Sequence, residues 1–121
     1  MILLAALALQ ALPSPALDRW TQVAVLDGQQ VAMDPQSITR SGTNVSVVVR
    51  GRILQDGQPV IAVVRYRYDC AANNVTREVT DAYDGDGHFV GTDDSPQPSR
   101  AIAATSLHET LRNYLCPRPG Q

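Results

Sequence analysis

Side chains that can act as catalytic bases are scarce in this sequence. The chain has 121 residues, and His88 and His108 are its only histidines. A nucleophilic serine or threonine needs a histidine base that a third group holds in place. Neither histidine stands near a Gly-x-Ser-x-Gly or another nucleophile signature, and phosphate-binding loops and dinucleotide fingerprints do not occur. We therefore expect no catalytic residue, no cofactor and no enzymatic activity.

Acidic side chains gather just before His88. Asp81, Asp84 and Asp86 lie in a stretch that also contains two glycines. A calcium loop of the EF-hand type needs a longer series of ligands that ends in glutamate, which is missing here. Asp and Gly are also the residues of an ordinary turn. We expect a turn and no metal site, and a hydrolase that uses His88 and these aspartates is the least favoured of three functional hypotheses.

The beginning of the chain has the pattern of a secretory signal. Residues 2–12 carry no charge and are almost all leucine and alanine, and such a run is too short for a permanent transmembrane helix. Ser14 and Ala16 have the small side chains and the spacing of a cleavage site after Ala16. A buried N-terminal helix is the alternative, but Pro13 and Pro15 would break it. The sequence therefore predicts a signal peptide.

Removal of residues 1–16 leaves a chain of single-domain size, residues 17–121. No later segment is long and apolar enough to cross a membrane. The net charge is −2 and all ten basic residues are arginines, whereas nucleic-acid binders usually carry a clear basic excess. We expect an exported protein in the periplasm, at the cell surface or in the medium, with no nucleic-acid partner.

Cys70 and Cys116 are the only cysteines. Exported proteins meet oxidising conditions, in which an even number of cysteines indicates disulfides. A catalytic or metal-bound thiolate would need partners such as a CxxC motif or nearby histidines, and the sequence supplies neither. We therefore predict one disulfide between Cys70 and Cys116.

The strongest structural signal is a hairpin in the middle of the chain. Residues 45–53 and 60–70 flank Asp56-Gly57, which is typical of a two-residue hairpin loop. Because side chains alternate between the faces of a strand, this loop determines which residues share a face. One face, called the tyrosine face below, collects Val47, Val49, Ile53, Ala62, Val64, Tyr66, Tyr68 and Cys70. The opposite face, called the arginine face, collects Val48, Arg50, Arg52, Ile61, Val63, Arg65 and Arg67.

Shorter strands are expected on either side of this hairpin. Residues 20–25 and 30–33 form the first two strands, and Asp34-Pro35 ends the second. Residues 88–90 form the last short strand, which a polar loop over residues 91–98 follows.

The turn Asn73-Asn74 closes a second hairpin. The same counting places Val79 beside Tyr68 and Tyr83 beside Val64, so both new side chains join the tyrosine face.

A helix is expected near the C-terminus. Ser106 and Glu109 have the spacing of a capping box, and Pro117 ends the helix. An apolar stripe at helical spacing contains Leu107, Leu111, Tyr114 and Leu115. Since Cys70 lies on the tyrosine face, a bond to Cys116 packs the helix on that face. The predicted fold class is α+β, an antiparallel sheet of five to six strands with one C-terminal α-helix on one face.

The arginine face is the candidate partner-binding site. Arg50, Arg52, Arg65 and Arg67 stand there among exposed aliphatic side chains, which is the composition of a contact surface. A solvated face whose arginines pair with Asp or Glu of neighbouring strands is the alternative. The occupant would be a protein partner or a second copy of the chain in a homodimer.

The order of features resembles the surface-adhesin protein E-like family of Gram-negative bacteria. The features are the early Trp20, the run Asp34-Pro35-Gln36-Ser37-Ile38, the run Tyr66-Arg67-Tyr68-Asp69-Cys70, and the Ser-capped final helix that ends in Leu115-Cys116. The resemblance implies an antiparallel sheet with a C-terminal helix fixed by one disulfide. It also implies a binding role, since the best-known member is a dimeric outer-membrane adhesin for vitronectin, laminin and plasminogen.

The leading hypothesis is therefore an exported, non-enzymatic binding module. The second is a periplasmic inhibitor or envelope-stress protein that inserts the loop of residues 91–98 into another protein's cleft.

Overall fold

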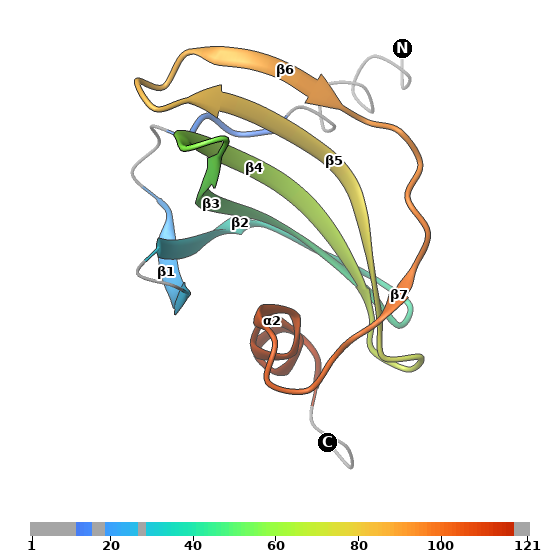
Figure 1. Ribbon diagram of the computed structural model, residues 1–121. Coiled ribbons are helices and arrows are strands. Elements are labelled where there is room, and N and C mark those ends of the chain that lie inside the picture. Colours follow the sequence, from blue (N-terminus) through green and yellow to red (C-terminus); the bar gives the residue numbers. More distant parts are fainter. Residues whose placement is uncertain (1–11, 16–18, 27–28, 118–121) are drawn as a thin grey trace.

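The fold is an antiparallel sheet that curves around one helix (Figure 1). The structure is a computed structural model that describes residues 12–15, 19–26 and 29–117. In chain order the elements are β1 (Thr21–Leu26), β2 (Gln29–Ser41), β3 (Asn44–Gln55), β4 (Gln58–Asp69), β5 (Asn74–Asp84), β6 (Phe89–Asp93), β7 (Arg100–Ala101) and α2 (Leu107–Leu115). Strands β1 to β6 are neighbours in sequence order, and β7 pairs with β5. The predicted class is confirmed, although the described residues form seven strands rather than five to six.

The central hairpin has the predicted register. Asp56 and Gly57 connect β3 and β4 with φ values of 52° and 77°, the left-handed conformations of a type I′ turn. Arg50 lies opposite Val63 and Arg52 lies opposite Ile61, as counting from this loop requires.

The predicted register of the second hairpin is wrong. Val79 lies opposite Arg65 and Tyr83 lies opposite Ile61, so both belong to the arginine face. The connection is longer than two residues, since Asp69 pairs with Asn74, and a register shift follows between Arg65 and Tyr66. Such a bulge adds one residue to one strand and reverses the face of every side chain beyond it.

Strand β2 does not end at Asp34-Pro35 as predicted. It continues to Ser41, and its pairing with β3 is interrupted only between Asp34 and Thr39. Proline lacks the N–H group of a sheet ladder but is tolerated at such an irregularity. The last predicted strand is also displaced, because β6 is Phe89–Asp93 and takes three residues from the expected loop.

The core lies between the tyrosine face and α2. Val47, Tyr68 and Leu111 are completely buried there, and Leu115 is 2% exposed. Ser106 caps the helix, since its Oγ accepts a hydrogen bond from the Glu109 N–H at 3.2 Å. The predicted helical stripe is wrong in one member. Tyr114 is 65% exposed, because the buried side of α2 turns toward His108 and leaves Tyr114 at the opposite edge.

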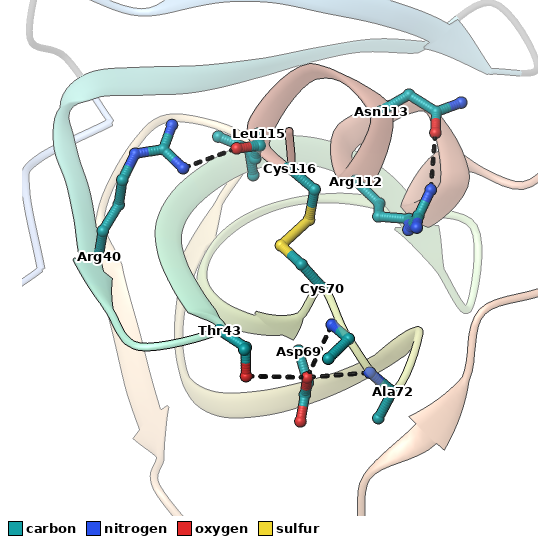
Figure 2. The surroundings of a disulfide bond; sticks show 10 residues. Arg40, Thr43, Asp69, Cys70, Ala72, Arg112, Asn113, Leu115 and Cys116 are labelled. Atoms are coloured by element: carbon teal, nitrogen blue, oxygen red, sulfur yellow. Dashed lines mark hydrogen bonds between the residues drawn. A yellow bond between two sulfur atoms is a disulfide. The ribbon is translucent and has the colours of Figure 1, made fainter. Parts of the chain in front are cut away.

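The predicted disulfide joins the end of β4 to the end of α2 (Figure 2). Cys70 and Cys116 have Cα atoms 5.7 Å apart, within the usual range for a disulfide. Arg40 of β2 donates from Nη1 to the Leu115 carbonyl oxygen at 2.7 Å. This bond places a cation at the negative end of the helix, where it is stabilising. The helix is thus held on the tyrosine face, as expected.

Candidate functional site

The four candidate arginines share one face of the sheet. In β3 and β4, Arg50 pairs with Val63 and Arg65 pairs with Val48, in adjacent rows of the same face. Arg52 is exposed, whereas Arg50, Arg65 and Arg67 are half-buried. The register therefore brings the four predicted arginines together, but three of them are partly covered by other residues of the chain.

The aliphatic side chains of the arginine face are not exposed as predicted. Val63 is fully buried and Val48 is 1% exposed. Residues that precede β1 lie against this face and account for part of the cover. Arg50 donates from Nη1 to the Pro15 carbonyl oxygen at 2.7 Å, and its guanidinium carbon lies 5.2 Å from the centre of the Trp20 ring. A cation over an indole face is attractive, so Arg50 links this segment to the sheet.

Two open clefts border this segment. The first has a volume of about 480 Å³ and contains Pro13, Val48 and the buried Asp34. Asp34 Oδ1 accepts from Arg19 Nε at 2.8 Å and from the Gln36 N–H at 2.9 Å.

The second cleft has a volume of about 620 Å³ and runs between Leu12, Arg65, Glu78 and Val79. Pro13 and Leu12 thus lie beside the arginine face, one at each cleft.

One arginine is paired within the sheet. Arg67 Nη1 lies 2.8 Å from Glu78 Oε2, and both side chains are partly exposed. Glu78 is the extra residue of the β5 bulge, since Arg77 pairs with Tyr66 and Val79 pairs with Arg65. The alternative of arginines paired with neighbouring acidic residues therefore holds for Arg67. Exposed pairs of this kind add little to stability.

A cluster on the tyrosine face was missed by sequence reasoning. The Tyr68 hydroxyl and His108 Nδ1 lie 2.9 Å apart, and the Tyr66 ring meets the His108 ring edge-on at 4.7 Å between centroids. Burial raises the pKa of the Tyr68 hydroxyl and lowers the pKa of His108. The sequence contained a signal for this cluster. The disulfide packs α2 on the face that holds Tyr66 and Tyr68, and His108 lies in the first turn of α2, on the side that meets this face.

The acidic segment before His88 forms a turn. Asp84 Oδ1 accepts hydrogen bonds from the N–H groups of Asp86 and His88, and these bonds lower the pKa of Asp84. Asp84, Asp86 and His88 offer ligand atoms within 4.8 Å of one another, whereas Asp81 is turned to Thr92, whose Oγ1 donates to it at 2.7 Å. Hydrogen bonds from an aspartate side chain to nearby backbone N–H groups are typical of an Asp–Gly turn. The predicted turn is therefore confirmed.

The segment proposed as an inhibitory loop is partly a strand. Gly91 and Asp93 belong to β6, and Asp93 Oδ1 accepts from the Ser95 N–H at 3.0 Å. That bond lowers the pKa of Asp93. Gln97 and Pro98 line a cleft beside α2 rather than project from the sheet. The free part of the loop is therefore shorter than the sequence indicated.

The comparisons with known proteins concern nearly the whole described chain. The sequence profile of the family described as Surface-adhesin protein E matches residues 20–117. No curated protein sequence matches the chain. Among the described residues, no helix has the length and apolar character that crossing a membrane requires.

Proposed function

Because the chain belongs to the surface-adhesin protein E family, we propose that it is an exported, non-enzymatic binding module that contacts a protein partner through the arginine face. One observation supports the proposal: residues 12–15 lie beside that face, and they precede the predicted cleavage site after Ala16, which itself lies outside the described residues. The family supports a binding role, and the arginine face has the arginine-rich, aliphatic composition that contact surfaces favour.

Signal removal changes the arginine face in this proposal. Cleavage after Ala16 takes away Pro13, which borders Val48, and Pro15, whose carbonyl oxygen accepts from Arg50. The cleft beside Val48 then becomes more open to solvent, and the Arg50 guanidinium loses an acceptor. An arginine beside newly exposed aliphatic surface is suited to a partner with acidic and apolar side chains.

The place of action follows from the same features. The disulfide between Cys70 and Cys116 fits an oxidising compartment outside the cytoplasm. The family indicates an exported or surface protein. The proposed signal peptide would deliver the chain to the periplasm, from which it acts there or at the cell surface.

The test is partner capture by the protein purified after export. Arg50→Glu together with Arg65→Glu reverses two charges on the arginine face. We expect at least tenfold weaker binding to immobilised vitronectin or laminin, or loss of a dimer in size-exclusion chromatography, with a nearly unchanged Tm. Arg100→Glu, an exposed arginine outside this face, is the matched control and should leave both readouts unaltered. Unaltered capture and elution volume in the double variant would overturn the proposal.

The second hypothesis predicts a different pattern. An inhibitor that acts through residues 91–98 would lose activity when the exposed residues Asp94, Ser95 and Pro96 are replaced by a short glycine linker. The arginine-face variants would then retain activity. A hydrolase would instead respond to His88→Ala, which leaves a binding module unaffected.

A further inference from the structure

The tyrosine face is only partly covered by α2. The helix has nine residues and spans about 13 Å, whereas β3 and β4 have 12 residues each and run for roughly 40 Å. The disulfide fixes the helix at the Cys70 end of β4. The hairpin end of this face is therefore left without a helix, and Ile53 is 52% exposed there.

A cavity of about 510 Å³ occupies this uncovered end. Its walls are mainly apolar and include Val31, Val49, Val64 and Leu107. Two of its lining residues, Gly51 and Ala62, are small and pair with each other, in a row of small residues that crosses four neighbouring strands. The row is Gly51, Ala62, Ala82 and Gly91. The volume lies within the range of roughly 300–1,000 Å³ that is usual for small-molecule sites.

A cationic cleft of about 200 Å³ lies beside α2 on the same face. Arg77, Arg100 and His108 line it together with Tyr66 and Gln97. Burial lowers the pKa of His108, so the two arginines supply the positive charge near neutral pH.

The charge of the cleft is only partly neutralised. Arg77 donates to Thr80 Oγ1 at 3.2 Å and lies 3.8 Å from Asp93 Oδ2. Arg100 is exposed, and no carboxylate of the described residues forms an ion pair with it. The cleft can therefore accept an anion.

The cavity and the cleft are adjacent. Tyr66 lines both of them, and the consecutive residues Leu107 and His108 of α2 line the cavity and the cleft respectively. An apolar compartment thus opens beside a positively charged one, with one tyrosine ring as the shared wall.

We propose that the tyrosine face binds an anionic single-chain amphiphile of the fatty-acid class. The apolar chain occupies the cavity between α2 and the β3–β4 hairpin, and the carboxylate occupies the cleft between Arg77 and Arg100. The arginine face lies on the other side of the sheet and meets this site only at Arg52, at the rim of the cavity.

The chemistry of both compartments fits such a ligand. Removing an alkyl chain from water stabilises binding by about 0.8 kcal/mol per buried methylene. Guanidinium groups bind carboxylates with paired hydrogen bonds, and the low polarity nearby strengthens the attraction. A neutral apolar molecule would leave the positive charge of the cleft only partly neutralised, whereas a small carboxylate without an alkyl chain would leave the cavity without an apolar occupant.

The probe is dodecanoate, with dodecanol as its uncharged counterpart, in isothermal titration calorimetry. We expect dodecanoate to bind at least tenfold more tightly than dodecanol. Replacing both arginines, Arg77→Gln with Arg100→Gln, should remove this difference and leave dodecanol binding unchanged. Arg65→Gln, on the opposite face, is the matched control and should change neither affinity.

Filling the hollow tests the apolar compartment. Gly51 lines the cavity and a Cβ there meets no atom within 4 Å, so Gly51→Leu places an apolar side chain at the cavity wall. It should weaken both probes at least tenfold while retaining the wild-type circular dichroism spectrum. Ala62→Leu is the second variant, in case the first does not fold.

Three results would overturn the proposal. The first is the absence of dodecanoate binding to the wild type. The second is dodecanoate binding that is unaffected by the Arg77 and Arg100 changes but lost in Arg52→Gln, since Arg52 lies at the rim of the cavity. The third is binding to phospholipid vesicles that dodecanoate does not displace, which would indicate a membrane-surface contact instead.

Discussion

Tyr68 joins the sheet to α2 at the scale of a single residue. Its side chain is fully buried, and its hydroxyl lies 2.9 Å from His108 Nδ1. Tyr68→Phe should lower the free energy of unfolding by about 1 kcal/mol through the lost hydrogen bond. Tyr68→Ala should cost about 3–5 kcal/mol, because it also leaves a cavity. Urea denaturation measures both losses. Tyr114 is an exposed tyrosine of α2, so the control variant Tyr114→Phe should leave the stability unchanged.

His108 makes the stability of the protein depend on pH. Burial disfavours its charged form and lowers its pKa below the usual value. As the pH falls through about 6.5, the unfolded chain takes up this proton first. The unfolded state then binds more protons than the folded state, so the free energy of unfolding decreases until the pH passes the lowered pKa.

The check is urea denaturation between about pH 8 and pH 5, a window set by the usual histidine pKa. His108→Asn should flatten this pH dependence, whereas His88→Gln should retain the part that His108 contributes, because it leaves the contact between His108 and Tyr68 in place. An equal slope in wild type and His108→Asn would contradict the assignment.

At the scale of elements, the β3–β4 hairpin depends on its turn. Gly57 has φ 77°, and a Cβ in this left-handed conformation costs roughly 1–2 kcal/mol. Gly57→Ala should lower the free energy of unfolding by that amount. Gly51→Ala is the matched control, since Gly51 lies inside β3 without positive φ and an added Cβ there would have no atom within 4 Å. It should be neutral or slightly stabilising, and equal losses in both variants would contradict the argument.

The two hairpins show where sequence reasoning succeeds and where it fails. Asp56-Gly57 has few alternative conformations, so the turn fixed the register of β3 against β4. The β4–β5 connection has no such constraint, and the bulge at Glu78 depends on contacts between strands rather than on local sequence. A single extra residue was enough to move Val79 and Tyr83 to the arginine face.

At the scale of the whole molecule, the disulfide spans 46 residues. A loop of this length reduces the entropy of the unfolded chain by an amount equivalent to about 4 kcal/mol. The variant with Cys70→Ala and Cys116→Ala should lose about that much stability in urea denaturation. Ser99→Ala leaves the disulfide intact and should stay much closer to the wild type. A loss below about 1 kcal/mol would show that packing alone holds α2 on the sheet.

The sequence also could not predict that residues before β1 lie against the arginine face. Alternation assigned Val48 and Val63 to this face correctly, but it cannot show which distant segment lies over a face. The contact between Pro15 and Arg50 joins residues 35 positions apart. The cluster of Tyr68 and His108 differs in this respect, because the disulfide between Cys70 and Cys116 was enough to place α2 over Tyr68.

Trp20 reports on this cover, since it is the only tryptophan in the chain. Its indole N–H donates to the Ser14 carbonyl oxygen at 3.2 Å, and Arg50 lies over its ring. If processing removes Ser14 and Pro15, the indole loses its acceptor and Arg50 loses the carbonyl that helps hold it in place. We expect the exported protein to emit at longer wavelength and to be quenched more strongly by acrylamide than the oxidised, unprocessed chain.

The control for this comparison is an unprocessed chain in which Ala16→Gln blocks the cleavage site. It should keep the emission spectrum of the unprocessed wild type after passage through the same purification. Identical spectra for processed and unprocessed protein would mean that residues 12–15 do not shield the arginine face. The surface around Val48 would then be equally accessible before and after export, and signal removal would have no part in exposing it.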